Sequence, residues 1–183
     1  MIRRQFLVAA AALWAALPFA ARAQVTDPEN TLYLDLEWGR VVIAMRPDLA
    51  PRHVARIKEL VRQGFYDGIV FHRVIRGFMA QAGDPNGRGD GGSGQKLPAE
   101  FSSQSHVRGT VSMARTNDPN SADSQFFICL DAATYLDRQY TVWGKVVSGM
   151  EFVDRIKKGA PGSGIVDGPD KIVRMRVAAD VKS

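Results

Sequence analysis

Short runs rich in apolar residues, separated by turns and loops, recur along this chain and predict strands. In 31–36 apolar and polar residues alternate, whereas 125–130 is apolar after its first residue. Alternate residues of each strand are expected to share a face. A hairpin is expected within 71–85, where two apolar segments flank a tight turn at Arg76-Gly77. Six further strands are expected over 31–36, 41–45, 109–113, 125–130, 141–147 and 172–178.

Two other segments have helical features. In 51–63, apolar residues recur every three or four positions between Pro51, which suits the first position of a helix, and Gly64, which suits its end. The second helix is expected after residue 148, where Ser148 and Glu151 match a capping box. The basic run Lys157-Lys158-Gly159 then predicts its last turn.

These elements together favour an all-β fold. The strands are joined mostly by loops and the two helices lie far apart, so the βαβ rhythm of a parallel sheet is absent. We therefore expect a closed eight-stranded antiparallel barrel capped by two α-helices over its open ends. The sequence shows no internal repeat and no second domain.

The first 23 residues have the pattern of a signal peptide. Arg3-Arg4 precedes an apolar run over 6–21, and Ala21-Arg22-Ala23 matches an A-x-A cleavage site. We expect cleavage before Gln24, which leaves a mature domain of residues 24–183 in the periplasm. The run is shorter than the roughly 18 apolar residues that predict a membrane span, and an uncleaved anchor is the alternative. The arginine pair matches a twin-arginine signal, and the Sec route is left open.

Removal of this leader weakens the charge argument for a nucleic-acid partner. The chain has 24 basic and 19 acidic residues, and three arginines precede residue 24, so 21 basic residues and a net charge of +2 remain. We expect no nucleic-acid partner and no stable membrane association after cleavage. The single cysteine, Cys129, lies in an apolar run, which favours a buried structural thiol over a nucleophile.

Residues 86–96 are too rich in glycine to form a helix or strand, and we expect a flexible surface loop. The glycine-rich stretch resembles a phosphate-binding loop, but it lacks the G-K-[ST] ending. Asp84, Asn86 and Asp90 resemble a calcium loop, but Gln95 stands where a bidentate acid is needed. Neither a phosphate site nor a metal site is therefore expected here.

Arg73 is the unusual residue of the hairpin, because this fixed charge stands among valine, phenylalanine and isoleucine. One interpretation pairs it with a carboxylate or directs it to water. The other places it at the rim of an apolar pocket, beside Phe78, Met79 and Gln81 of the returning strand. Strand alternation directs His72 away from Arg73, so we expect His72 to be structural.

Several motifs, in order and spacing, resemble the cyclophilin family of peptidyl-prolyl cis-trans isomerases over residues 31–181. The family's eight-stranded barrel with two helices agrees with the elements expected above. The resemblance implies an enzyme that works without a cofactor or a metal. The matching stretches are Phe71-His72-Arg73, Gly77-Phe78-Met79-Ala80-Gln81, Ser112-Met113-Ala114-Arg115, Ser124-Gln125-Phe126-Phe127-Ile128, Tyr135-Leu136-Asp137 and Gln139-Tyr140-Thr141-Val142.

The resemblance also implies roles for individual residues. Arg73 matches the catalytic arginine of the family. Tyr135 stands where eukaryotic members commonly have Trp, which implies weak binding of cyclosporin, and Arg115 stands where many of them have Asn. The substrate-binding positions are Phe78, Met79, Phe127 and Leu136 in the proline pocket, Gln81, Ala114, Arg115 and Gln125 along the substrate backbone, and Tyr135 and Tyr140 at the edge.

Rotation about an Xaa-Pro bond breaks no covalent bond, so neither a nucleophile nor a general base is required. Arg73 can donate a hydrogen bond to the proline nitrogen, which regains its lone pair as the amide twists. We expect an isomerase that assists the folding of exported proteins. The alternative is a chaperone or assembly module that binds proline-containing segments with incidental turnover. The expected partners are proline-containing polypeptides, and the expected oligomeric state is a monomer.

Overall fold

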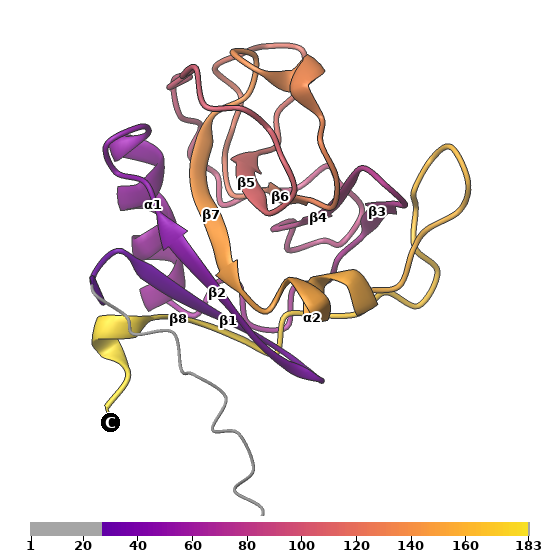
Figure 1. The fold of residues 1–183 in the computed structure, drawn as a ribbon, viewed down its shortest axis with the longest axis horizontal. Helices are drawn as coiled ribbons and strands as arrows, with labels where there is room; N and C mark the ends of the chain where they lie inside the picture. Colours follow the sequence, from indigo (N-terminus) through magenta and orange to yellow (C-terminus); the bar gives the residue numbers. More distant parts are fainter. Residues whose placement is uncertain (1–26, 183) are drawn as a thin grey trace, which may run out of the picture.

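The computed structural model describes residues 27–182, which form one eight-stranded sheet with two α-helices against it (Figure 1). The expected leader and its cleavage site lie outside the described residues. The expected strands and helices are present, with ends shifted by a few residues. The elements are β1 (Thr31–Leu36), β2 (Gly39–Met45), α1 (Pro51–Arg62), β3 (Arg73–Ile75), β4 (Met79–Ala82), β5 (Thr110–Met113), β6 (Phe126–Cys129), η1 (Thr134–Leu136), β7 (Val142–Ser148), α2 (Met150–Arg155), β8 (Arg174–Val177) and η2 (Ala178–Asp180).

The expectation of a closed barrel was wrong. The strand order is β3-β4-β6-β5-β7-β2-β1-β8, with antiparallel neighbours throughout, and the edge strands β3 and β8 do not pair with each other within residues 27–182. Isolated bridges join Val70 to Lys171 and Arg73 to Ile165 instead. The physical reason is the segment 156–173, whose glycines and two prolines prevent a continuous ladder between these edges.

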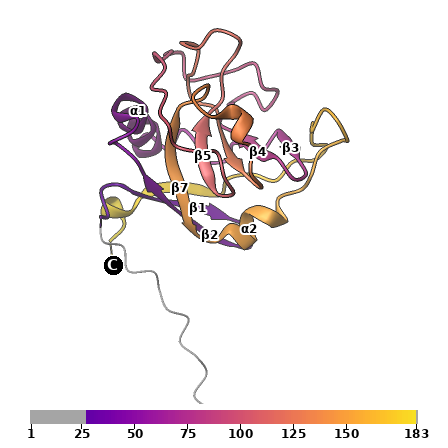
Figure 2. The same cartoon turned by 45° about the horizontal axis from the view of Figure 1, so that its top comes forward.

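Helix α1 packs the face that its apolar spacing predicts against the main core. Its buried residues include Val54, Ile57, Leu60 and Val61, which belong to the same apolar cluster as the inward-facing residues of β1, β2 and β8. Pro51 occupies the first turn, where its missing N–H costs no hydrogen bond. The sheet curves around this core in the turned view of Figure 2. The expected helix over 51–63 is therefore confirmed to within one residue.

Helix α2 begins one residue later than its expected capping box. Ser148 is the last residue of β7 and pairs with Val42, so its extended backbone does not cap the helix. The N-cap is Gly149, with φ +86°, and no side chain caps the helix. An added Cβ at Gly149 would lie 2.5 Å from the carbonyl oxygen of Arg40. Strand pairing and a close backbone approach thus prevail over the local capping signal.

The C-terminal end of α2 is also earlier than expected. The helix ends at Arg155, but the ammonium group of Lys158 donates to the carbonyl oxygens of Asp154 and Ile156, both at 2.6 Å. A basic side chain therefore satisfies the last carbonyl groups, as the Lys157-Lys158 run predicts. Helix α2 also contacts the β1–β2 turn. The indole Nε1 of Trp38 in that turn donates to the Phe152 carbonyl at 2.8 Å.

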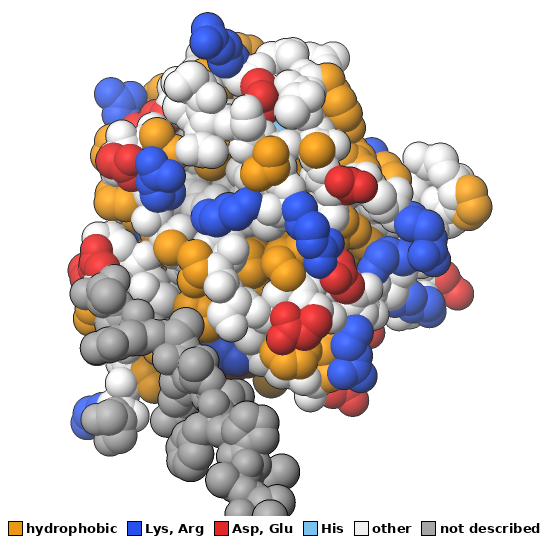
Figure 3. All heavy atoms as spheres, viewed as in Figure 1, with side chains coloured by type: hydrophobic (Ala, Val, Ile, Leu, Met, Phe, Trp, Pro, Cys, Tyr) orange, Lys and Arg blue, Asp and Glu red, His pale blue; other side chains and the backbone are white. Residues whose placement is uncertain are grey.

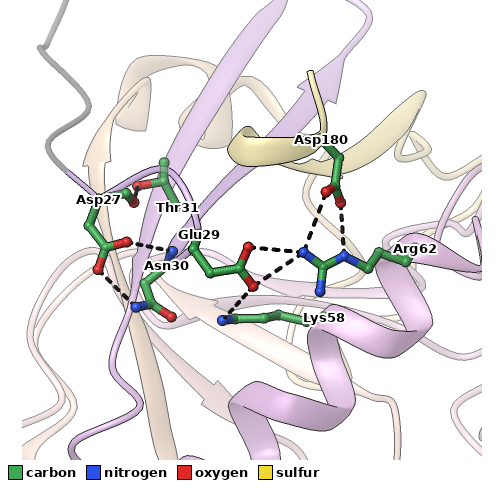
Figure 4. Close-up of polar contacts among 7 residues, drawn as sticks. All are labelled: Asp27, Glu29, Asn30, Thr31, Lys58, Arg62 and Asp180. Atoms are coloured by element: carbon green, nitrogen blue, oxygen red, sulfur yellow. Dashed lines mark hydrogen bonds and ion pairs between the residues drawn. The ribbon is translucent and has the colours of Figure 1, made fainter. Parts of the chain in front are cut away.

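An ion-pair network joins the first and last described segments to α1 (Figure 4). Arg62 lies between Glu29 at 3.0 Å and Asp180 at 2.9 Å, and Lys58 also contacts Glu29 at 3.2 Å. Each exposed pair contributes at most about 1 kcal/mol, so the network orients the two ends more than it stabilises the fold. Both ends lie far from the β3–β4 hairpin in Figures 1 and 2.

The surface carries both signs of charge. On the face shown in Figure 3, basic and acidic side chains are interspersed rather than gathered by sign. Among residues 27–182, none of the helices is both long enough and apolar enough to cross a membrane.

Candidate active site

The site is built on one row of side chains that crosses the sheet. Arg73 on β3 is directly opposite Gln81 on β4, and Gln81 is opposite Phe127 on β6. Residues opposite each other on antiparallel strands point to the same face, so these three side chains lie side by side. The turn at Arg76-Gly77 makes this possible, since Gly77 has φ +70°, which costs glycine little. The expected hairpin is therefore confirmed.

Arg73 is held by neutral acceptors. Its Nη1 donates to Gln81 Oε1 at 3.4 Å, and its Nε donates to the Ser163 carbonyl at 3.1 Å. Among residues 27–182, no carboxylate forms a salt bridge with Arg73. The interpretation of Arg73 as half of an ion pair is therefore wrong, and its charge is available to a ligand at the pocket rim.

A chain of two carboxamides orients Gln81. Gln81 Nε2 donates to Gln125 Oε1 at 2.9 Å, and Gln125 Nε2 donates to the Gly91 carbonyl at 2.9 Å. The Gly91 carbonyl can only accept and the Arg73 guanidinium can only donate. These two ends leave one consistent orientation for both amides, and in it Gln81 presents its oxygen to Arg73.

The pocket beside Arg73 has a volume of about 110 Å³. Its apolar walls belong to a small cluster, separate from the main core, that includes Met79, Phe127 and Leu136. Pockets for drug-sized ligands enclose roughly 300–1,000 Å³, so this one suits a single small side chain. The lining residues are Arg73, Phe78, Met79, Gln81, Ala114, Arg115, Phe127, Leu136 and Tyr140.

Two of the expected site residues do not line this pocket. Gln125 acts on it through Gln81, as described above. Tyr135 is 63% exposed and lies beside Phe78, with ring centroids 5.8 Å apart, so it belongs to the outer rim. Sequence reasoning also missed Ser163, because an acceptor carbonyl in a loop ninety residues from Arg73 leaves no sequence signal.

Arg115 is a wall of the pocket rather than a free cation. Its guanidinium lies over the Tyr140 ring, 4.5 Å from the centroid, and its Nε and Nη2 donate to the Gln139 carbonyl at 3.0 and 2.8 Å. Its Nη1 donates to the Thr116 carbonyl at 2.8 Å. These contacts hold the chain that carries Tyr140 against the segment that follows β5 and carries Ala114.

A second hollow, of about 330 Å³, adjoins the pocket and shares Gln81, Ala114 and Arg115 with it. Part of its lining comes from the glycine-rich loop 86–96. Asp123, which also lines it, accepts hydrogen bonds from the backbone N–H groups of Ser93 at 2.7 Å and Gly94 at 3.0 Å. Sequence reasoning did not identify Asp123 as a residue near the site.

The same loop is ordered from the other side by Asp84. This carboxylate is 1% exposed and accepts from the backbone N–H groups of Asn86, Arg88 and Gly89. Burial opposes its ionisation, but these donors outweigh burial and lower the pKa of Asp84. Oxygen atoms that face N–H donors are not arranged for a cation, and residues 27–182 contain no group of three or more metal-binding side chains.

His72 and Cys129 lie outside the pocket. The His72 side chain is buried with both ring nitrogens unpaired, and burial lowers its pKa, which favours the neutral imidazole. Cys129 is fully buried, and burial raises the pKa of its thiol to about 12, so the nucleophilic thiolate is disfavoured. Both placements agree with the structural roles expected for these residues.

Comparison with known proteins shows the family. The model for the cyclophilin type peptidyl-prolyl cis-trans isomerase family matches residues 31–177. The chain is 52% identical to a probable peptidyl-prolyl cis-trans isomerase of Brucella suis over an alignment that covers 98% of both chains. It is 42% identical to a peptidyl-prolyl cis-trans isomerase of Synechococcus elongatus, over 67% of this chain and 90% of that one.

Solved structures agree in fold and family. A cyclophilin from Hirschia baltica matches with a TM-score of 0.77 and 30% identity, over 85% of this chain and 76% of the other. A cyclophilin type isomerase of Cryptosporidium parvum, crystallised in the presence of the dipeptide Ala-Pro, matches with a TM-score of 0.74 and 26% identity, over 80% and 98% of the two chains. The chain therefore belongs to the cyclophilin-type peptidyl-prolyl cis-trans isomerases, enzymes that catalyse rotation about Xaa-Pro peptide bonds.

Proposed function

We propose that the pocket beside Arg73 binds the proline ring of a polypeptide and that Arg73 accelerates rotation about the preceding bond in exported proteins. The observation that carries this proposal is a guanidinium that has no carboxylate partner within residues 27–182 and lies at the rim of an apolar pocket sized for one small side chain. The Ala-Pro dipeptide named with the Cryptosporidium parvum structure supports a proline-containing ligand here.

The catalytic step follows from the electronic structure of the amide. Resonance gives a planar amide a rotation barrier of roughly 18–20 kcal/mol. In the twisted state the proline nitrogen is pyramidal and its lone pair can accept a hydrogen bond from Arg73. That bond is stronger in the transition state than in the planar ground state, which is the condition for catalysis. The contacts of Arg73 with Gln81 and Ser163 preorganise the donor before substrate arrives.

The remaining residues hold the substrate while one side of the bond turns. Met79, Phe127 and Leu136 enclose the proline ring, and Gln81 with the main chain of Ala114 and Arg115 binds the backbone on the other side. Rotation then takes place in a held substrate. Rotation makes and breaks no covalent bond to hydrogen, so this step needs no general acid or base.

A peptide assay separates catalysis from binding alone. The mature protein should accelerate cis-trans exchange of a short Xaa-Pro peptide, measured by magnetisation transfer in NMR. Phe127→Ala should weaken peptide binding, whereas Val173→Ala, at an exposed position before β8, should not. A protein that binds the peptide without accelerating exchange would be a proline-segment-binding module.

The proposed site of action is the periplasm, where a mature domain of residues 24–183 would meet unfolded exported chains. The proposal rests on the leader pattern of residues 1–23. N-terminal sequencing of the periplasmic protein should begin at Gln24, and an intact Met1 in a membrane fraction would contradict cleavage. Changing Arg3 and Arg4 both to Lys should stop export by the twin-arginine route, and normal export of this variant would indicate the Sec route.

A further inference from the structure

A buried imidazole lies directly behind the proline pocket. His106 is fully buried, with its Nδ1 3.0 Å from Asp137 Oδ1 and its Nε2 2.8 Å from Ser112 Oγ. In the neutral ring, Nδ1–H donates to the carboxylate and Nε2 accepts from the hydroxyl. Both nitrogens are therefore satisfied, in contrast to those of His72.

This Ser-His-Asp order matches that of hydrolase triads, but the site excludes hydrolysis. Ser112 and His106 both have 0% exposure, and neither lines the pocket beside Arg73 or the adjoining hollow. A nucleophile must reach the substrate, and Ser112 lies inside β5 with all four strand residues buried. Any effect of the Ser112–His106–Asp137 hydrogen bonds on the substrate must therefore pass through the residues that contact His106.

The neighbours of His106 are the walls of the pocket. Its ring stacks on Phe127, with centroids 6.1 Å apart and an interplanar angle of 20°, and meets Tyr140 edge-on at 6.4 Å. Ser112, which bonds to the ring, is opposite Phe127 on the adjacent strand. One imidazole thus contacts a wall residue carried by the sheet and another carried by a loop.

His106 also fixes both ends of η1. Its backbone N–H donates to Asp137 Oδ1 at 2.7 Å, immediately after η1, and its carbonyl accepts from the Ala133 N–H at 2.8 Å, immediately before it. The element η1 has three residues and no side-chain cap. Leu136 in η1 and Tyr140 after it line the pocket from this loop, and we call these two residues the loop wall.

We propose that His106 is a positioning residue that holds the loop wall at the distance from Phe127 that a proline ring requires. Backbone ladders fix Phe127 and Gln81, whereas the loop wall is held by side chains. Arg115 holds it at Gln139 and Tyr140, and the bonds between His106 and Asp137 hold it at η1. Loss of the bonds between His106 and Asp137 leaves Arg73 in place but lets the loop wall pack less closely against the proline ring of the substrate. The substrate KM should therefore rise while kcat changes little, because ground-state and transition-state binding weaken together.

The test compares two buried histidines. His106→Phe keeps an aromatic ring against Phe127 and removes both side-chain hydrogen bonds. His53→Phe is the matched control, because His53 is also fully buried and bonds to a carboxylate, Glu100, at 2.6 Å, but belongs to α1 and does not line the pocket beside Arg73. Both variants should lower Tm. Only His106→Phe should raise KM for an Xaa-Pro peptide, by about three- to tenfold, the factor for one hydrogen bond.

A second pair of variants covers the case in which His106→Phe does not fold. Asp137 is partly exposed, so Asp137→Ala should fold, and it should raise KM because the anchor of η1 is lost. Asp137→Asn retains an oxygen that accepts from both N–H groups of His106 and should recover most of the affinity. Equal KM values for Asp137→Ala and the natural protein, or an equal rise in His53→Phe, would overturn the inference.

This inference rests on the proposed proline pocket, and the two can fail separately. If Phe127→Ala leaves peptide affinity unchanged, the pocket is not the binding site. If Phe127→Ala weakens binding but the His106 and Asp137 variants do not, the pocket stands and the positioning role of His106 is wrong.

Discussion

Arg73 and Gln81 face each other across β3 and β4, and the guanidinium Nη1 donates to the amide oxygen at 3.4 Å. This long bond orients the arginine without neutralising it, because a carboxamide carries no net charge. A carboxylate at the same place would bind the guanidinium more strongly and compete with the substrate for its donors. The pairing with an amide therefore leaves the donor oriented and available.

Arg73→Ala should remove most of the catalysis while leaving the fold intact. The removed group is a preorganised donor, and loss of a comparable donor costs roughly 10²–10³ in rate in other enzymes. Arg73→Lys should recover only part of the rate, because a flexible point charge does not reproduce the guanidinium fork. Turnover, peptide affinity and circular dichroism should be measured for each variant.

Peptide affinity should fall far less than turnover in these variants, since the apolar walls of the pocket remain. Arg174→Ala is the matched control, because Arg174 is an exposed arginine on β8 outside the pocket. A folded Arg73→Ala protein that retains most of its turnover would remove Arg73 from the mechanism.

Tyr135→Trp should tighten inhibition by cyclosporin and leave peptide turnover nearly unchanged. Tyr135 lies on the rim beside Phe78 and is largely exposed, so a larger ring can be accommodated there without repacking. An indole offers more contact area than a phenol and an N–H donor at a different position. Inhibition constants for both proteins test this, with Val173→Trp as a control for an added exposed indole. Strong inhibition of the natural protein would show that residue 135 does not control binding.

The free energy of unfolding should decrease as the pH falls below about 6.5, in part because of His72. Burial is the largest effect on His72 and lowers its pKa, although Asp84 favours its protonation. The unfolded chain therefore takes up the proton first, and each further decrease in pH favours unfolding until the folded His72 is protonated as well. At pH values above this range, His72 is neutral in both states and does not change the free energy of unfolding.

His72→Phe should consequently reduce the slope of unfolding free energy against pH between about pH 7 and pH 5. Urea denaturation at several pH values measures the slope. The pKa of His53 is lowered for the same first reason, burial, so part of the slope should persist in the single variant. An unchanged slope in His72→Phe would contradict this account.

Gly149→Ala should destabilise the fold more than Gly94→Ala. Both glycines have φ +86°, so the cost of about 1–2 kcal/mol for a left-handed non-glycine residue is shared by both variants. Only at Gly149 would the new Cβ meet backbone, 2.5 Å from the Arg40 carbonyl oxygen, whereas Gly94 has no neighbour within 4 Å. Urea denaturation should show the difference. Equal losses of stability would mean that the close approach of Gly149 to β2 relaxes freely.

Local patterns were sufficient for most of the elements. The apolar residues alternate along 31–36 and recur at helical spacing in 51–63, because each element buries one face against the core. This pattern can be read from the sequence of each segment alone. The family resemblance of the motifs around Arg73, Phe127 and Leu136 identified the residues that line one pocket, together with Gln125 and Tyr135, which do not line it. Sequence by itself therefore determined the strand and helix content and most of the site residues.

Features that depend on two distant segments were decided only by the tertiary structure. The sheet stays open between β3 and β8 because residues 156–173 pair irregularly, and Ser148 enters β7 because β2 offers it a partner. The neutral environment of Arg73 comes from Ser163 and Gln81, and the support behind the pocket comes from His106. These contacts depend on how the chain returns on itself in space, and no local spacing of residue types encodes that return.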